Sequence, residues 1–207
     1  MKNKKKIVAS IALIGALTFG GTWAFFQSSD SKTNIFTMGD NVKAEVVEKE
    51  WEETGKKLAE NFYSSLVIPK DPKVVIESGT TDVYTAVKVE YFLTDDQGNE
   101  TATTYAELAK FLDIDFASKK WVFEDNTKSV AIYTDKLSGS SATETVFDTI
   151  TIKEAAVHPD SEEAKLPGAI VMKNFNIKVT GYVCQANIEG TSTAKAALQK
   201  AFPSLFE

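Results

Sequence analysis

The sequence predicts an all-β protein, an antiparallel β-sandwich with a jelly-roll-like topology and one or two short helices, preceded by a signal-peptide helix. About seven segments either alternate apolar and polar residues or are rich in β-branched residues, as strands are. Turn-forming glycine, proline, asparagine and aspartate residues separate these segments. The chain has 207 residues, of which 43% are hydrophobic, and contains no internal repeat. We therefore expect one β-sandwich domain over residues 41–207.

Two long strands carry most of this prediction. Every second residue from 83 to 93 is apolar or threonine, which indicates one buried face. Residues 174–183 alternate in the same way and are expected to have one buried and one wet face. Pro69 and Pro72 exclude a central strand at their position, because proline cannot donate to a ladder. Shorter strands are expected at residues 42–46, 121–123, 129–134 and 143–153.

Helical patterns are few. A capping box that begins at Thr104 starts a short amphipathic helix whose apolar residues continue to Leu112. A second helix is expected over residues 193–202 and is stopped by Pro203. Residues 48–63 are charged with interspersed apolar positions, which fits either a helix or a long connection.

The first residues have the pattern of a signal peptide. Four lysines at positions 2, 4, 5 and 6 precede an apolar run over residues 7–19. Thr22 and Ala24 are the small residues of a cleavage site, so we expect residues 1–24 to be removed before Phe25. Loss of the four lysines changes the net charge from −6 to −10. An uncleaved membrane anchor is the alternative, since residues 7–26 are about long enough to span a bilayer.

Composition argues against several classes of function. All 23 basic residues are lysine, so bidentate arginine contacts to phosphate or guanine are impossible, and we expect no nucleic-acid partner. His158 is the only histidine and lies in an acidic loop, which leaves no base for a catalytic triad. Cys184 is the only cysteine, which excludes an internal disulfide, and it is expected to be a small buried thiol. We therefore predict no catalytic residues.

Two other groups of residues have both a purely structural and a functional interpretation. Residues 95–100 gather oxygen ligands around Gly98, but they do not fit the EF-hand spacing. We expect an acidic turn there, with no metal site and no cofactor, and calcium is the one alternative. Trp51 and Trp121 are expected to pack in the core, although together they would suit a sugar-binding platform.

Two stretches near the N-terminus resemble a known family. Gly-Gly-Thr-Trp-Ala-Phe-Phe at residues 20–26 and Asn-Ile-Phe-Thr-Met-Gly-Asp at residues 34–40 resemble the junction of the TasA/camelysin group. These are exported proteins of Gram-positive bacteria that are processed by a dedicated ER-type signal peptidase, SipW. Residues 42–52, with Glu50-Trp51-Glu52, and residues 68–74 are similar to segments of a clostridial branch of the group. Residues 76–80 depart from the branch, because they lack its usual Asn-x-Gly.

The resemblance implies a secreted structural protein of the cell surface or the extracellular biofilm matrix. Its N-terminal arm, residues 25–40, would insert as a strand into the next subunit and so build head-to-tail filaments. Its partners would then be other copies of itself and, during export, the signal peptidase. The anchoring side chains would be apolar residues of the arm: Phe25, Phe26, Ile35, Phe36 and Met38.

Two alternatives stay open beside this interpretation. The arm could fold back as the first strand of its own domain. The protein could instead be a monomeric extracellular module that binds carbohydrate or a host surface. Camelysin-type proteins have also been described as metallopeptidases, but the sequence has no His-Glu-x-x-His motif and only one histidine. We therefore do not expect peptidase activity.

Overall fold

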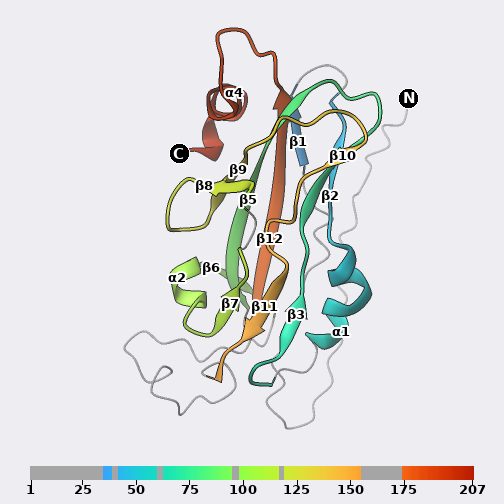
Figure 1. The fold of residues 1–207 in the computed structure, drawn as a ribbon. Coiled ribbons are helices and arrows are strands. Elements are labelled where there is room, and N and C mark those ends of the chain that lie inside the picture. Colours follow the sequence, from blue (N-terminus) through green and yellow to red (C-terminus); the bar gives the residue numbers. More distant parts are fainter. Residues whose placement is uncertain (1–34, 39–41, 60–62, 95–97, 117–118, 155–173) are drawn as a thin grey trace, which may run out of the picture.

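Two β-layers face one another in the computed structural model, which describes residues 35–38, 42–59, 63–94, 98–116, 119–154 and 174–207 (Figure 1). The predicted fold class, an all-β sandwich with few and short helices, is confirmed by this arrangement. The expected signal-peptide helix lies outside the described residues.

The first layer is a six-stranded sheet built around two long strands. β5 (Val83–Thr94) and β12 (Asn174–Gln185) run antiparallel and pair along their whole length. The strand order is β1 (Ile35–Met38), β12, β5, β9 (Val130–Tyr133) and β8 (Trp121–Phe123), and β6 (Glu100–Thr103) pairs with the end of β5. The one parallel pair among the described strands is β1 with β12, which departs from the purely antiparallel prediction.

The second layer is a bent pair of three-stranded sheets. One has the order β10 (Ser141–Ala142), β4 (Lys73–Ile76), β2 (Ala44–Val47), and the other β3 (Val67–Pro69), β11 (Thr149–Ile152), β7 (Leu112–Ile114). Backbone hydrogen bonds from Lys70 N to Asp148 O (3.0 Å) and from Val146 N to Pro72 O (2.8 Å) pair the connection between β3 and β4 with the connection between β10 and β11, where the chain passes from one sheet to the other. The layer therefore bends where the chain passes from β3 to β4.

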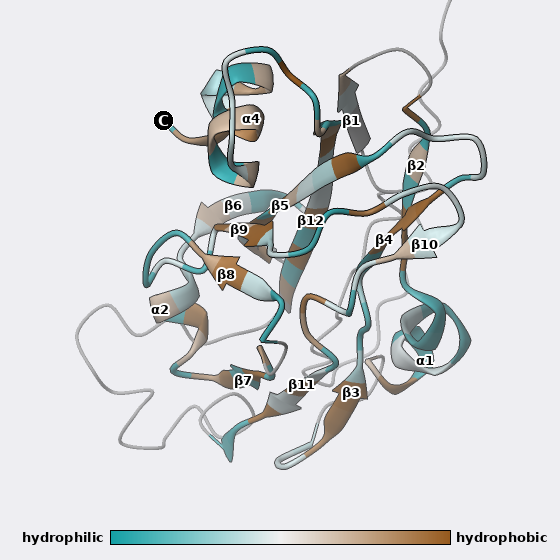
Figure 2. Ribbon diagram, turned by 45° about the horizontal axis from the view of Figure 1, so that its top comes forward, coloured by the Kyte–Doolittle hydropathy of each residue, from teal (hydrophilic) through white to brown (hydrophobic). Residues whose placement is uncertain are grey.

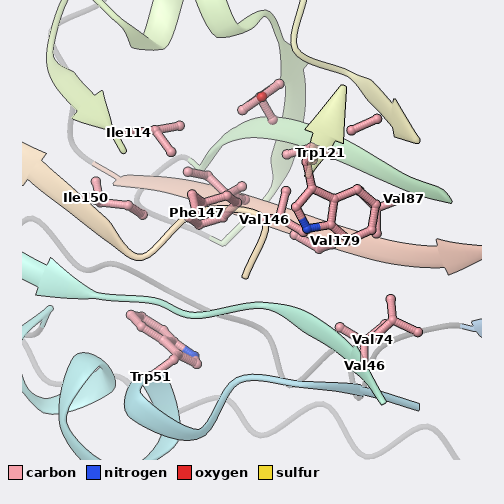
Figure 3. Packing of buried hydrophobic residues seen from close by; sticks show 14 of the residues in the cluster. Val46, Trp51, Val74, Val87, Ile114, Trp121, Val146, Phe147, Ile150 and Val179 are labelled. Atoms are coloured by element: carbon pink, nitrogen blue, oxygen red, sulfur yellow. The ribbon is translucent and has the colours of Figure 1, made fainter. Parts of the chain in front are cut away.

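The main core fills the space between the layers. Val87 of β5 and Val179 of β12 meet Val146, Phe147 and other residues contributed by the second layer (Figure 3). The four named residues are at most 3% exposed. Alternate residues of β5 point into this core, as the sequence pattern predicts.

A second apolar cluster lies on the outer face of the six-stranded sheet. Helix α4 (Ala194–Ala201) and the following 3₁₀ turn η2 (Pro203–Leu205) lie beside one end of the long strands (Figure 2). They pack Leu198 and Leu205 over Ala86, Ile132 and Cys184. The predicted C-terminal helix is thereby confirmed. The prediction of a solvent-exposed face on β12 is wrong. On that face α4 covers Cys184, and Asn176 is buried and donates a hydrogen bond to Glu100 of β6.

The other helical segments are short. Residues 51–58 form the π-helical turn η1 (Trp51–Gly55) and α1 (Lys56–Leu58), so the segment is helical rather than a long connection. The capping hydrogen bond at Thr104 is present, with Glu107 N donating to its hydroxyl, but α2 (Tyr105–Leu108) is shorter than predicted. Leu112 belongs to β7, because pairing with β11 takes over where the helix was expected to continue.

Two strand predictions need correction for a similar reason. The strand expected over residues 143–153 is confined to β11, since residues 143–148 turn through the bend of the layer. β4 was not predicted, yet it is the central strand of its sheet. Pro72 lies just before β4, where its missing N–H costs no ladder bond.

Candidate functional site

The candidate site is the edge of the six-stranded sheet formed by β1 and β12. Ile35 pairs with Gly181, and the parallel register continues to Met38 opposite Cys184. β1 has four residues, whereas β12 has twelve, so the ladder covers one end of β12. A ladder of this length contributes few hydrogen bonds, each with a net value of about 1 kcal/mol.

β1 lies at the rim where the chain crosses between the layers. It contacts both β12 of the first layer and β2 of the second layer (Figure 1). Val42 and Val46, which follow β1 in the chain, are buried at 8% and 7% exposure. Thr37 is exposed, and Met38 is 45% exposed. Side-chain anchoring in the core is therefore strong at β2 and weak at the end of β1.

The predicted site residues divide into two groups. Thr22, Ala24, Phe25 and Phe26 lie outside the described residues, as does His158. The residues Ile35, Phe36 and Met38 all belong to β1, which in this structure pairs with β12 of its own chain.

Cys184 is buried beneath α4, as expected for a small packed thiol. It is 0% exposed and forms no disulfide. Burial raises the pKa of the thiol to about 11, although a hydrogen bond with the Tyr84 backbone works in the opposite direction. The group is therefore protonated at neutral pH and shielded from reagents.

Both tryptophans considered for sugar binding are core residues. Trp51 is 2% exposed and Trp121 is 4% exposed. Trp121 donates its indole N–H to Glu144 O at 2.9 Å, and Figure 3 shows Trp51 well apart from it, beside its own helical segment. The two rings cannot form an exposed platform, so the sugar-platform alternative is wrong for these residues.

The acidic turn considered for calcium is described from Gly98 onward. Gly98 has a φ of 83°, the left-handed conformation that a tight turn requires and glycine adopts without strain. The Glu100 carboxylate accepts hydrogen bonds from Lys178 and from Asn176. Within the described ranges there is no group of three or more His, Cys, Asp or Glu side chains arranged to hold a metal ion.

The structure also brings together a buried polar cluster that the sequence reasoning missed. Lys70 Nζ lies 2.7 Å from Glu48 Oε2 and 4.6 Å from the centre of the Trp51 ring. The side chain of Lys70 is 3% exposed and that of Glu48 is 17% exposed. The Asp71 carboxylate accepts the backbone N–H groups of Glu50 (2.8 Å) and Trp51 (3.2 Å).

The electrostatics of this cluster follow from its burial. Burial lowers the pKa of Lys70, and the neighbouring Glu48 and Asp71 carboxylates oppose this shift. The cluster joins the two segments, 42–52 and 68–74, whose motifs carry the family resemblance. The available sequence signal for this cluster was a lysine between two prolines and a glutamate, Glu48, three residues before a tryptophan. The sequence alone does not place these residues side by side.

No family model, no curated protein and no solved structure matches this chain. Among the helices of the described residues, none combines the length and apolar character needed to cross a bilayer.

Proposed function

We propose that this protein is a secreted structural protein, a subunit of TasA-like filaments at the cell surface or in the extracellular biofilm matrix. The observation that supports the proposal most is the placement of β1. This strand carries Ile35, Phe36 and Met38 of the expected arm, and it lies at a sheet edge in a four-residue parallel ladder. A parallel edge strand can be supplied by another copy without any change in the rest of the sandwich.

In this proposal, β1 pairs with its own β12 in the monomer, and the arm of a neighbouring copy takes the same place in the filament. The hydrogen bonds exchanged are the same in both forms, so the equilibrium depends on concentration. Donor and acceptor surfaces differ, which makes the contact head-to-tail and the assembly open-ended.

A single cysteine substitution distinguishes the two pairings. Met38 is the register partner of Cys184, and neighbouring strands place such partners within the range that a disulfide spans. We expect Met38→Cys filaments, oxidised after assembly, to give disulfide-linked multimers on non-reducing gels. The monomeric protein, oxidised when dilute, should give an internal disulfide instead.

The controls use the same strand. Thr37→Cys pairs with Val183 and should give no such bond. Deletion of residues 25–38, which removes β1 together with the rest of the arm before it, should leave a folded protein that does not polymerise. Filaments that contain only internal disulfides would overturn the exchange of β1. Monodisperse particles at high concentration, seen by negative-stain electron microscopy, would instead favour the monomeric binding module.

A further inference from the structure

The buried Lys70–Glu48 pair has the arrangement of two groups that can join covalently. Lys70 Nζ lies 2.7 Å from Glu48 Oε2, and the lysine side chain is 3% exposed. We propose that the Lys70 Nζ and the Glu48 side-chain carbonyl carbon form an intramolecular amide bond, a permanent crosslink between the segment before η1 and the bend between β3 and β4.

Both reacting groups are held by their surroundings. The ring of Trp51 lies against the Lys70 ammonium, 4.6 Å from Nζ, and restricts its position. The Asp71 carboxylate binds the N–H groups of Glu50 and Trp51, which fixes the start of η1 relative to Lys70. Groups held at contact distance react as if at very high concentration, which offsets the unfavourable condensation of an amine with an acid in water.

The chemistry balances without any co-reactant. The ammonium first passes a proton to the Glu48 carboxylate along their hydrogen bond, which gives a neutral amine and a neutral acid. Burial favours this transfer, because it lowers the pKa of Lys70. The amine lone pair then adds to the carbonyl carbon. The carbon–hydroxyl bond breaks, and the hydroxyl leaves with a proton from nitrogen as one molecule of water.

Asp71 has a supporting part in this step. Its negative charge acts on the Lys70 amino group and is largely buried, with the residue 7% exposed. The same charge would stabilise the positively charged nitrogen that forms when the amine adds to the carbonyl carbon. Asp71 is therefore a positioning and electrostatic residue and does not itself form a bond.

The amide product carries no charge. The ion pair, in contrast, keeps two charges in a site where they are poorly solvated. The amide also links positions 22 residues apart in a chain whose single cysteine permits no internal disulfide. A crosslink of this kind restricts the unfolded chain as a disulfide does.

The Lys70–Glu48 pair differs from other close ion pairs in its burial and not in its distance. Lys110 Nζ and Glu107 Oε2 are also 2.7 Å apart, but their side chains are 31% and 39% exposed. Water solvates that pair, so it should remain an ordinary ion pair.

The test is a mass measurement on protein purified after expression of the full chain. We expect the denatured, reduced protein to be lighter than its calculated mass by one water molecule. Protease digestion should then yield one branched peptide that joins Glu48 to Lys70. Lys70→Met should restore the calculated mass, and the matched control Lys110→Met should retain the deficit.

Recovery of Lys70 and Glu48 in separate, unmodified peptides from the unsubstituted protein would overturn the proposal. This readout does not depend on whether a variant folds. It is also independent of filament formation, because it is made on single chains.

Discussion

At the scale of single residues, the buried hydroxyl groups of the described core fall into two groups: some accept a hydrogen bond, and others have no hydrogen-bond partner. Thr143 Oγ1 accepts the Val74 N–H at 3.0 Å, and Tyr133 OH accepts the Glu144 N–H at 3.1 Å. The hydroxyls of Thr85 and Thr94 are buried without a hydrogen-bond partner. A buried hydroxyl without a partner loses its hydrogen bonds to water and gains nothing in exchange.

This contrast predicts opposite effects for the same substitution. Thr85→Val should raise the free energy of unfolding by about 1 kcal/mol, because it removes the unpaired hydroxyl and keeps the branched shape. Thr143→Val should lower it by about 1 kcal/mol, because it leaves the Val74 N–H unpaired. Urea denaturation of both variants measures the difference, and a destabilised Thr85→Val protein would contradict the argument.

At the scale of secondary-structure elements, α4 is held by the sheet rather than by its own stability. It has eight residues, which is too short for a helix to persist alone in water. Thr193 caps its start by accepting the Ala196 N–H at 3.2 Å. Leu198 is 0% exposed and lies in the cluster over Cys184. The helix therefore stays docked because of its apolar face.

Truncating that face should loosen the helix. Leu198→Ala is expected to lower the free energy of unfolding by about 2–4 kcal/mol, the usual range for a buried leucine. It should also speed the labelling of Cys184 by a thiol reagent in native buffer, since the helix covers this thiol. Both effects are measured on one protein sample.

Gln199→Ala is the matched control, because Gln199 lies next to Leu198 on the exposed face of α4. It should leave both stability and labelling nearly unchanged. Equal labelling rates in the unsubstituted protein and in Leu198→Ala would mean that the thiol becomes accessible by a route other than the loosening of α4.

At the scale of the whole molecule, net charge would oppose the proposed assembly. The expected removal of residues 1–24 would take four lysines from a chain of net charge −6 and leave −10. Identical copies with that charge repel one another until salt screens them. The Debye length falls from about 30 Å at 0.01 M to about 8 Å at 0.15 M ionic strength.

Growth of the proposed filaments from the protein of residues 25–207 should therefore accelerate as sodium chloride is raised over this range. Light scattering measures the rate, and Met38→Cys locked in its internal disulfide serves as the non-assembling control. Slower growth at higher salt would indicate that attraction between opposite charges, and not strand exchange against a net repulsion, drives the contact.

The two long strands could be predicted from the sequence, because their alternation is itself the physical cause of their burial. The N-cap residues Thr104 and Thr193 were equally predictable, since a cap depends on residues three positions apart. The candidate site could be predicted in part: its residues were named, but the parallel register of Ile35–Met38 with β12 was not.

What the sequence by itself determined is local: the periodicity of β5 and β12, the helix caps, and the exclusions that follow from one cysteine and one histidine. Only the tertiary structure decided that Leu112 is in a strand, that α4 covers one end of the outer face of β12, and that Lys70 meets Glu48 and Trp51. These features depend on contacts between segments far apart in the chain. A local pattern carries no information about which distant segment will supply the partner, and burial there outweighs local propensity.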